Sequence, residues 1–208
     1  MTTPNRAVAR HGTPEWFAAR REGVSATAVA KACTPAGFRD EVAKALHPEE
    51  NQVVDNEYMK FGRDWEQWIV DNLPPEFGIV ANDWLIHAEG HKWQLATPDG
   101  LNAAGTVIAE VKTTGKDWGA GTIPIQYRRQ VQWQLYVTGA SACVFAWLLR
   151  GVDDNGQMVP AWYQPKHLVI NRDEEMIAQL VAIAERLQME CVYQTRLEQE
   201  IENGKILA

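Results

Sequence analysis

Two short stretches decide the fold of this chain: Thr97-Pro98-Asp99-Gly100 and Val107-Ile108-Ala109-Glu110-Val111-Lys112. The apolar residues of the second stretch predict a buried strand. Alternation along a strand places Glu110 and Lys112 on the same face. An acid beside a base is costly to bury unless the two groups serve each other or a metal ion. Asp99 occupies a turn just upstream, so it can fold back towards that face. The two stretches therefore predict one polar site on a core strand.

Helical periodicity and capping residues predict further elements on both sides of this strand. Helices are expected at residues 13–22, from 25, at 39–46, 57–73, 124–138 and 174–202, and strands at 79–88, 91–96, 107–112, 142–149, 158–163 and 167–170. The strands at 79–88 and 91–96 form a hairpin around Glu89-Gly90. Helices followed by a β-meander and then helix, strand and helix predict an α/β core with an N-terminal helical elaboration.

The length and composition are typical of one globular domain covering residues 1–208. Within it we expect N-terminal helices at about 13–47, a catalytic core at about 57–170 and a C-terminal helix at about 173–203. No window is long and apolar enough for a membrane span, and the N-terminus lacks the apolar core of a signal peptide. Three widely separated cysteines argue against a disulfide framework, and they cannot supply the four thiolates of an iron–sulfur cluster. These features favour a cytoplasmic protein.

The net charge of −7 counts against a protein that coats nucleic acid non-specifically. It does not exclude a nuclease, because such an enzyme concentrates carboxylates around metal ions, and the bound cations reverse the local field. A DNA path would then come from a local basic strip or from an assembled oligomer.

The polar site has the composition of a centre that hydrolyses phosphodiesters with two divalent ions. Asp99 and Glu110 are the natural ligands, with the Val111 carbonyl as a further oxygen, and Mg²⁺ prefers such hard donors. Glu66 offers a third carboxylate from the helix at residues 57–73. Lys112 can approach the attacking water or the phosphate. A neighbouring metal and low exposure would lower the pKa of Lys112, which suits proton transfer.

The helix at residues 124–138 presents polar side chains beside its apolar ones. Tyr127, Gln130 and Gln134 share one face. Buried amides need hydrogen-bond partners, and the Lys112 ammonium or a metal-bound water would serve. Packing or capping explains Gln134 equally well.

Several of these motifs resemble those of the phage lambda exonuclease and YqaJ-type viral recombinase family, within the PD-(D/E)xK nuclease superfamily. The matching segments occur in the same order: Gly62-Arg63-Asp64-Trp65-Glu66, Thr97-Pro98-Asp99-Gly100-Leu101, Glu110-Val111-Lys112 and Tyr127-Arg128-Arg129-Gln130-Val131-Gln132. Residues from Trp16 to Thr27 are similar to the N-terminal signature of the family. The resemblance implies a restriction-endonuclease-like core, a central mixed sheet flanked by helices.

The resemblance also implies an activity and partners. We expect a Mg²⁺-dependent 5′→3′ exonuclease, with Mn²⁺ as a substitute, that degrades one strand of duplex DNA to 5′-mononucleotides and leaves 3′ overhangs for recombination. Arg21, with Ser25 or Thr27, would hold the 5′-phosphate of the DNA end, and Gln130 would lie near Lys112. A homotrimer, a single-strand annealing partner and a phage or prophage origin in a bacterial host are further implications.

Other interpretations remain beside this one. Asp99-Gly100 alone is typical of a turn, and Glu-x-Lys alone is typical of a solvated strand. An endonuclease of the same fold, or a DNA-end-binding protein without activity, would carry similar motifs. Trp118, Tyr127 and Arg128 are candidates for DNA contact, although a solvated helix face explains Arg128 as well. For Trp65, Trp133 and Trp147, core packing is the better interpretation.

Overall fold

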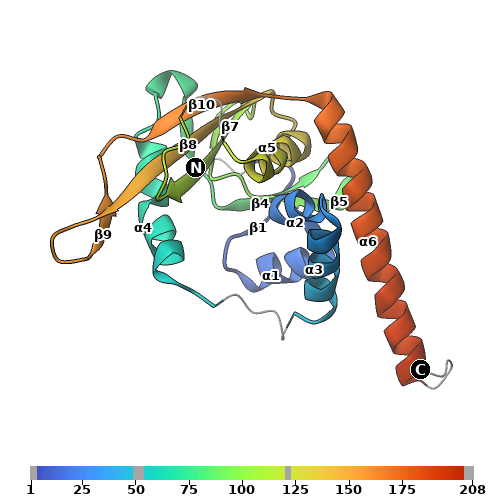
Figure 1. Cartoon of the computed structure of the whole chain (residues 1–208). Helices are drawn as coiled ribbons and strands as arrows, with labels where there is room; N and C mark the ends of the chain where they lie inside the picture. Colours follow the sequence, from blue (N-terminus) through green and yellow to red (C-terminus); the bar gives the residue numbers. More distant parts are fainter. Residues whose placement is uncertain (1–3, 49–53, 120–122, 204–208) are drawn as a thin grey trace.

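Strands β7 (Val107–Thr114) and β8 (Ala142–Val152) lie side by side in the larger of two β-sheets of the computed structural model, which describes residues 4–48, 54–119 and 123–203 (Figure 1). The two strands are parallel, and Lys112 is paired with Trp147. The strand order is β10-β8-β7-β6-β3, and the other pairs are antiparallel. The remaining strands of this sheet are β3 (Ile79–Ala81), β6 (Gly100–Asn102) and β10 (Lys166–Asn171). Strand β9 (Met158–Pro160) pairs with the far end of β8.

Helices α4 (Glu57–Asp71) and α5 (Ile125–Thr138) cover opposite faces of this sheet. Ala109 and Val111 of β7 pack in the cluster that contains the apolar side of α4. Ile108 packs instead with Val131 and Leu135 of α5. The alternation of β7 therefore directs Glu110 towards α5, with Val111 on the α4 side.

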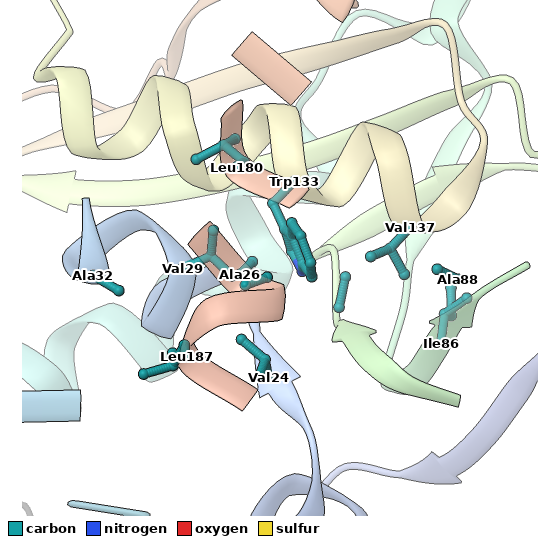
Figure 2. Close-up of a cluster of buried hydrophobic side chains, with 12 residues drawn as sticks. Val24, Ala26, Val29, Ala32, Ile86, Ala88, Trp133, Val137, Leu180 and Leu187 are labelled. Atoms are coloured by element: carbon teal, nitrogen blue, oxygen red, sulfur yellow. The ribbon is translucent and has the colours of Figure 1, made fainter. Parts of the chain in front are cut away.

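The smaller sheet has the order β1-β4-β5-β2, formed by β1 (Ala7–Arg10), β4 (Trp84–Ala88), β5 (His91–Ala96) and β2 (Val24–Ser25). Helices α1 (Pro14–Glu22), α2 (Ala26–Ala32) and α6 (Glu174–Glu202) contact this sheet, and α3 (Pro35–Leu46) packs on α2 and α6. Figure 2 shows where α2, α5 and α6 meet: Trp133 of α5 lies in one buried cluster with Val29 of α2 and with Leu180 and Leu187 of α6. The Trp133 indole Nε1 also donates to the Leu95 carbonyl at 3.0 Å, so α5 joins the two sheets.

The α/β fold with a mixed sheet, flanking helices and an N-terminal helical elaboration is the fold that the sequence predicts. The predicted bounds of α6 are confirmed, as is the hairpin of β4 and β5, whose turn includes Gly90 at φ +76°. Of the described helices, none has the length and apolar character that a membrane crossing requires. Trp133 and Trp147 are buried, as predicted, whereas Trp65 is half-buried.

The single strand predicted for residues 79–88 is wrong. It is divided at Asn82 into β3 and β4, which belong to different sheets. The Asn82 side chain donates from Nδ2 to the main-chain carbonyls of Trp84 and Pro98. Its Oδ1 accepts from the main-chain N–H of Trp84. These side-chain bonds to the main chain replace the ladder at this position.

Helix α3 begins earlier than predicted, at Pro35 instead of Arg39. Thr34 caps it by accepting from the Gly37 amide at 3.1 Å, and Pro35 takes the first helical position. Thr34-Pro35 is therefore the same start signal as Thr13-Pro14. The strand predicted at 158–163 is also too long, because β9 ends at Pro160.

Candidate active site

Glu110 lies at the centre of a hydrogen-bonded cluster between β7 and α5. Its side chain is almost completely buried, with 1% exposed. Oε1 forms an ion pair with Lys112 Nζ and accepts from Gln130 Nε2 at 2.6 Å, and Oε2 accepts from Gln134 Nε2 at 2.6 Å. All three partners donate to a carboxylate, which is the strong type of hydrogen bond.

The cluster follows from the periods of the two elements. Glu110 and Lys112 are two residues apart on a strand, and Gln130 and Gln134 are four apart on a helix, so each pair shares a face. Buried Gln134 would be costly without a partner, and Glu110 provides one. The Gln134 side-chain oxygen, Oε1, has no hydrogen-bond partner in the described part of the chain. Of the two interpretations open for Gln134, the structure shows an amide that orients Glu110.

The turn before β6 brings Asp99 back onto β7. The Asp99 amide donates to the Ala109 carbonyl at 2.9 Å, and its Oδ2 accepts from the Val111 amide at 2.7 Å. Pairing of β6 with β7 extends only to Ala109, so Val111 lies beyond the ladder. The N–H and C=O of one strand residue point to the same side. The Val111 carbonyl therefore faces the Asp99 side.

The charges of the cluster change its pKa values. Burial raises the pKa of Asp99 well above its usual range, and the neighbouring Glu110 raises it further while Lys112 acts in the opposite sense. Burial alone would lower the pKa of Lys112, but Glu110 and Asp99 outweigh it and raise that pKa. The predicted lowering for Lys112 therefore does not hold for the chain by itself, and the lysine is an ammonium ion.

Glu66 approaches the same charges from α4 and retains access to solvent. The pKa of Glu66 is raised, chiefly because neighbouring atoms desolvate it. Lys112 and His11 act to lower this pKa, and Glu110 acts to raise it. The His11 ring contacts the Trp16 ring, with centroids 4.5 Å apart. Sequence reasoning missed His11, since nothing in the chain near residue 11 indicates that it faces α4.

The donors fit hard divalent cations, although they are not yet arranged as ligands. Asp99, Glu110 and the Val111 carbonyl offer oxygens on one side of β7. Burial is the main cause of the raised pKa of Asp99, and the charge of Glu110 adds to it, so a cation beside these two carboxylates would favour their charged forms. Across residues 4–48, 54–119 and 123–203, no three acidic, histidine or cysteine side chains converge on one point at ligand distance. Binding would require Glu110 to exchange one of its present partners for the ion.

The residues predicted to hold the DNA end lie around a second feature, a cavity of about 810 Å³ between α1, α3 and α6. Arg20, Arg21 and Ser25 line it, together with Lys44 and Arg196. Ser25 also caps α2, whereas Thr27 is exposed and lies outside the lining. The Arg20 guanidinium lies over the Trp16 ring at 4.7 Å, and burial lowers its pKa while Glu41 acts in the opposite sense.

The other predicted DNA contacts lie near the lysine. The Lys112 ammonium lies 5.6 Å from the centre of the Tyr127 ring. Trp118 packs against the rings of Tyr127, Phe145 and Trp147 at 5.4–6.0 Å. This packing accounts for the conformation of Trp118 without DNA. Arg128 is half-buried on α5.

Glu110 and Lys112 lie on the central strand, Asp99 reaches them from the turn before β6, and two helical glutamines orient Glu110. This arrangement defines the site of a PD-(D/E)xK-type protein. The sequence matches the YqaJ-like viral recombinase domain over residues 15–141, so this chain belongs to that family. A comparison with curated proteins gives no match.

Solved structures extend the similarity to nearly the whole chain. An alkaline exonuclease from Laribacter hongkongensis (LHK-Exo) is 27% identical, with a TM-score of 0.69 over 91% of this chain and 100% of that one. LHK-Exo in complex with dAMP is 26% identical, with a TM-score of 0.69 over 94% of this chain and 100% of that one. A phage-related exonuclease from Haemophilus somnus 129PT, 13% identical, shares the fold, with a TM-score of 0.65 over 85% of this chain and 96% of that one.

Proposed function

We propose that this protein is a Mg²⁺-dependent 5′→3′ exonuclease that acts on the ends of double-stranded DNA. It would release 5′-mononucleotides and leave 3′ overhangs for phage-type recombination. The observation that carries the proposal is the buried Glu110, held by Lys112, Gln130 and Gln134 beside Asp99. The likeness to an alkaline exonuclease along its entire length supports it, as does the solved complex of that protein with dAMP.

Each group of the cluster has a distinct task in this reaction. Asp99, Glu110 and the Val111 carbonyl would hold the cations, with Glu66 at the rim. Two divalent ions, when bound, supply a nucleophilic hydroxide and neutralise charge on the phosphate. The Lys112 ammonium donates hydrogen bonds to the attacking water or to a phosphate oxygen, where negative charge develops. Gln130 and Gln134 would keep the Glu110 carboxylate in one orientation when a cation replaces one of its present partners.

The acidic chain must still hold a polyanion. We propose a homotrimer around the DNA, because a ring multiplies the few basic residues of each subunit along one path. Mn²⁺ would substitute for Mg²⁺, since both accept oxygen ligands. A single-strand annealing protein would be the partner that receives the 3′ overhang.

Dependence on DNA ends separates this function from its alternatives. We expect release of nucleotides from linear duplex with Mg²⁺ and none from a covalently closed circle of the same sequence. Cleavage of the circle would identify an endonuclease of the same fold. Binding of ends without release of nucleotides, in Mg²⁺ or in Mn²⁺, would identify a DNA-end-binding protein.

Arg21→Ala should remove the preference for 5′-phosphorylated ends, because a guanidinium is the side chain best suited to hold a phosphate. The measurement is the initial rate on end-labelled linear duplex with a 5′-phosphate or a 5′-hydroxyl. Arg39→Ala is the matched control, since Arg39 is exposed on α3 and does not line the cavity of Arg21. An unchanged preference in the Arg21 variant would refute the placement of the 5′-phosphate.

A further inference from the structure

A group of exposed aromatic side chains lies on α4 and on the segment after β9. Tyr58 is 54% exposed, Trp162 40% and Tyr163 67%, and we call these three residues the aromatic surface. The Tyr163 ring contacts those of Trp65 and Trp68, with centroids 5.8 and 6.3 Å apart. Figure 1 shows the β8–β9 hairpin extending outwards beside α4. Because large aromatic side chains are usually buried, such a group marks a binding surface.

Two cations are stacked on these rings. The Arg150 guanidinium lies 4.6 Å from the centre of the Tyr58 ring, and the Lys166 ammonium lies 4.8 Å from that of Trp162. Lys166 is paired with Asp117. Arg150 has no carboxylate within 4.0 Å among the residues described, and its buried Nε has no hydrogen-bond partner there. Beside the exposed rings of the aromatic surface, Arg150 therefore carries a positive charge that no carboxylate of the described residues pairs with.

The aromatic surface lies near the same end of β7 as the Glu110 cluster, on the α4 side of the sheet. Alternation along β8 places Arg150 on the face of Leu148, which packs with α4, whereas Lys112 shares the α5 face with Glu110. In the parallel pair of β7 and β8, Lys112 lies opposite Trp147 and Thr114 opposite Leu149. Arg150 follows Leu149 directly, so it is displaced from Lys112 by three residues along the sheet, roughly 10 Å. A nucleic acid strand with a phosphate at Lys112 would therefore pass round the end of β7, from the α5 side to the α4 side, to reach Arg150 and Tyr58.

We propose that the aromatic surface binds the unpaired bases of single-stranded DNA next to the active site. The inference rests on the proposed function, since an enzyme that degrades one strand of a duplex leaves the other strand unpaired. Faces of bases are hidden in a duplex and available in a single strand, and aromatic side chains stack on them. Arg150 would contact a phosphate of the same strand.

The test measures binding without cleavage. A single-stranded oligonucleotide with 2-aminopurine, a base whose fluorescence falls on stacking, is titrated with protein in EDTA, and a blunt duplex is titrated in parallel. Replacing Tyr58 and Tyr163 together by Ala should weaken single-strand binding by about tenfold or more, with no change for the duplex. Replacing both by Phe should retain the affinity, because the ring is kept. Tyr193→Ala is the matched control, a tyrosine of α6 that is 60% exposed.

The outcomes separate this inference from the proposed function. No single-strand binding by the unmodified protein, equal affinity in the Ala variant, or an equal loss for the duplex would each overturn the inference, even if the protein digests linear DNA. A selective loss would support it whether or not Mg²⁺ promotes cleavage. Photo-crosslinking of the unmodified chain to single-stranded DNA with 5-iododeoxyuridine is a second measurement. Crosslinks at Tyr58, Trp162 or Tyr163 support the inference, and crosslinks only elsewhere contradict it.

Discussion

Lys112→Ala should abolish nuclease activity while DNA binding is retained. Among the residues that the structure describes, the Lys112 ammonium is the one cation in contact with Glu110, and its raised pKa keeps it charged at neutral pH. Removal of such a group, which acts on the reacting water or phosphate, lowers kcat by about a hundredfold to ten-thousandfold. The measurement is nucleotide release from end-labelled linear duplex, with binding followed separately in EDTA.

Glu110 keeps its hydrogen bonds from Gln130 and Gln134 in this variant, so the chain should remain folded. Circular dichroism checks this point. Lys92→Ala is the matched control, because Lys92 is exposed on β5, in the other sheet. Substantial turnover by the Lys112 variant, at more than about a tenth of the normal rate, would rule out the role assigned to the lysine.

The sequence predicts the centre of the site well because its residues are local to two elements. Glu110 and Lys112 depend only on the period of one strand, and Gln130 and Gln134 only on the period of one helix. Contacts across the fold are a different matter. The charge effect of His11 on Glu66, and the position of Arg196 at the cavity of Arg21, each join residues far apart in the sequence. No pattern along the chain encodes these distances.

The same distinction applies to the fold. The start of α6 at Glu174 and its end at about Glu202 are predicted because Asp173 caps the helix and its apolar face is regular. Strands β1 and β2 of the smaller sheet escape prediction, since they are short and pair with strands distant in sequence. Both are stabilised by tertiary pairing rather than by their own residues. Asn82 shows the opposite failure, where one side chain interrupts an otherwise regular strand pattern.

Asp99→Asn should make the metal-free chain more stable and the enzyme inactive. The pKa of Asp99 is raised in the folded chain, chiefly by burial and then by Glu110. Between its unfolded and folded pKa values the folded chain therefore binds more protons, and the free energy of unfolding falls as pH rises through that window. Above it, Asp99 is a charged group that destabilises the fold. Asparagine removes this charge and can still accept from the Val111 amide.

Thermal unfolding in EDTA at about pH 8, far above the ordinary pKa of Asp, should show a Tm roughly 2–4 °C higher in the Asn variant. The gain should shrink as pH falls towards that ordinary value. Mg²⁺ should raise the Tm of the unmodified chain, since a ligand of the folded state stabilises it, and have little effect on the variant. Nucleotide release should fall at least about a hundredfold. Asp40→Asn, an exposed change on α3, should leave all three measurements unaltered. A lower Tm for Asp99→Asn in EDTA, or an equal Mg²⁺ response in both proteins, would show that Asp99 is a structural residue and not a ligand.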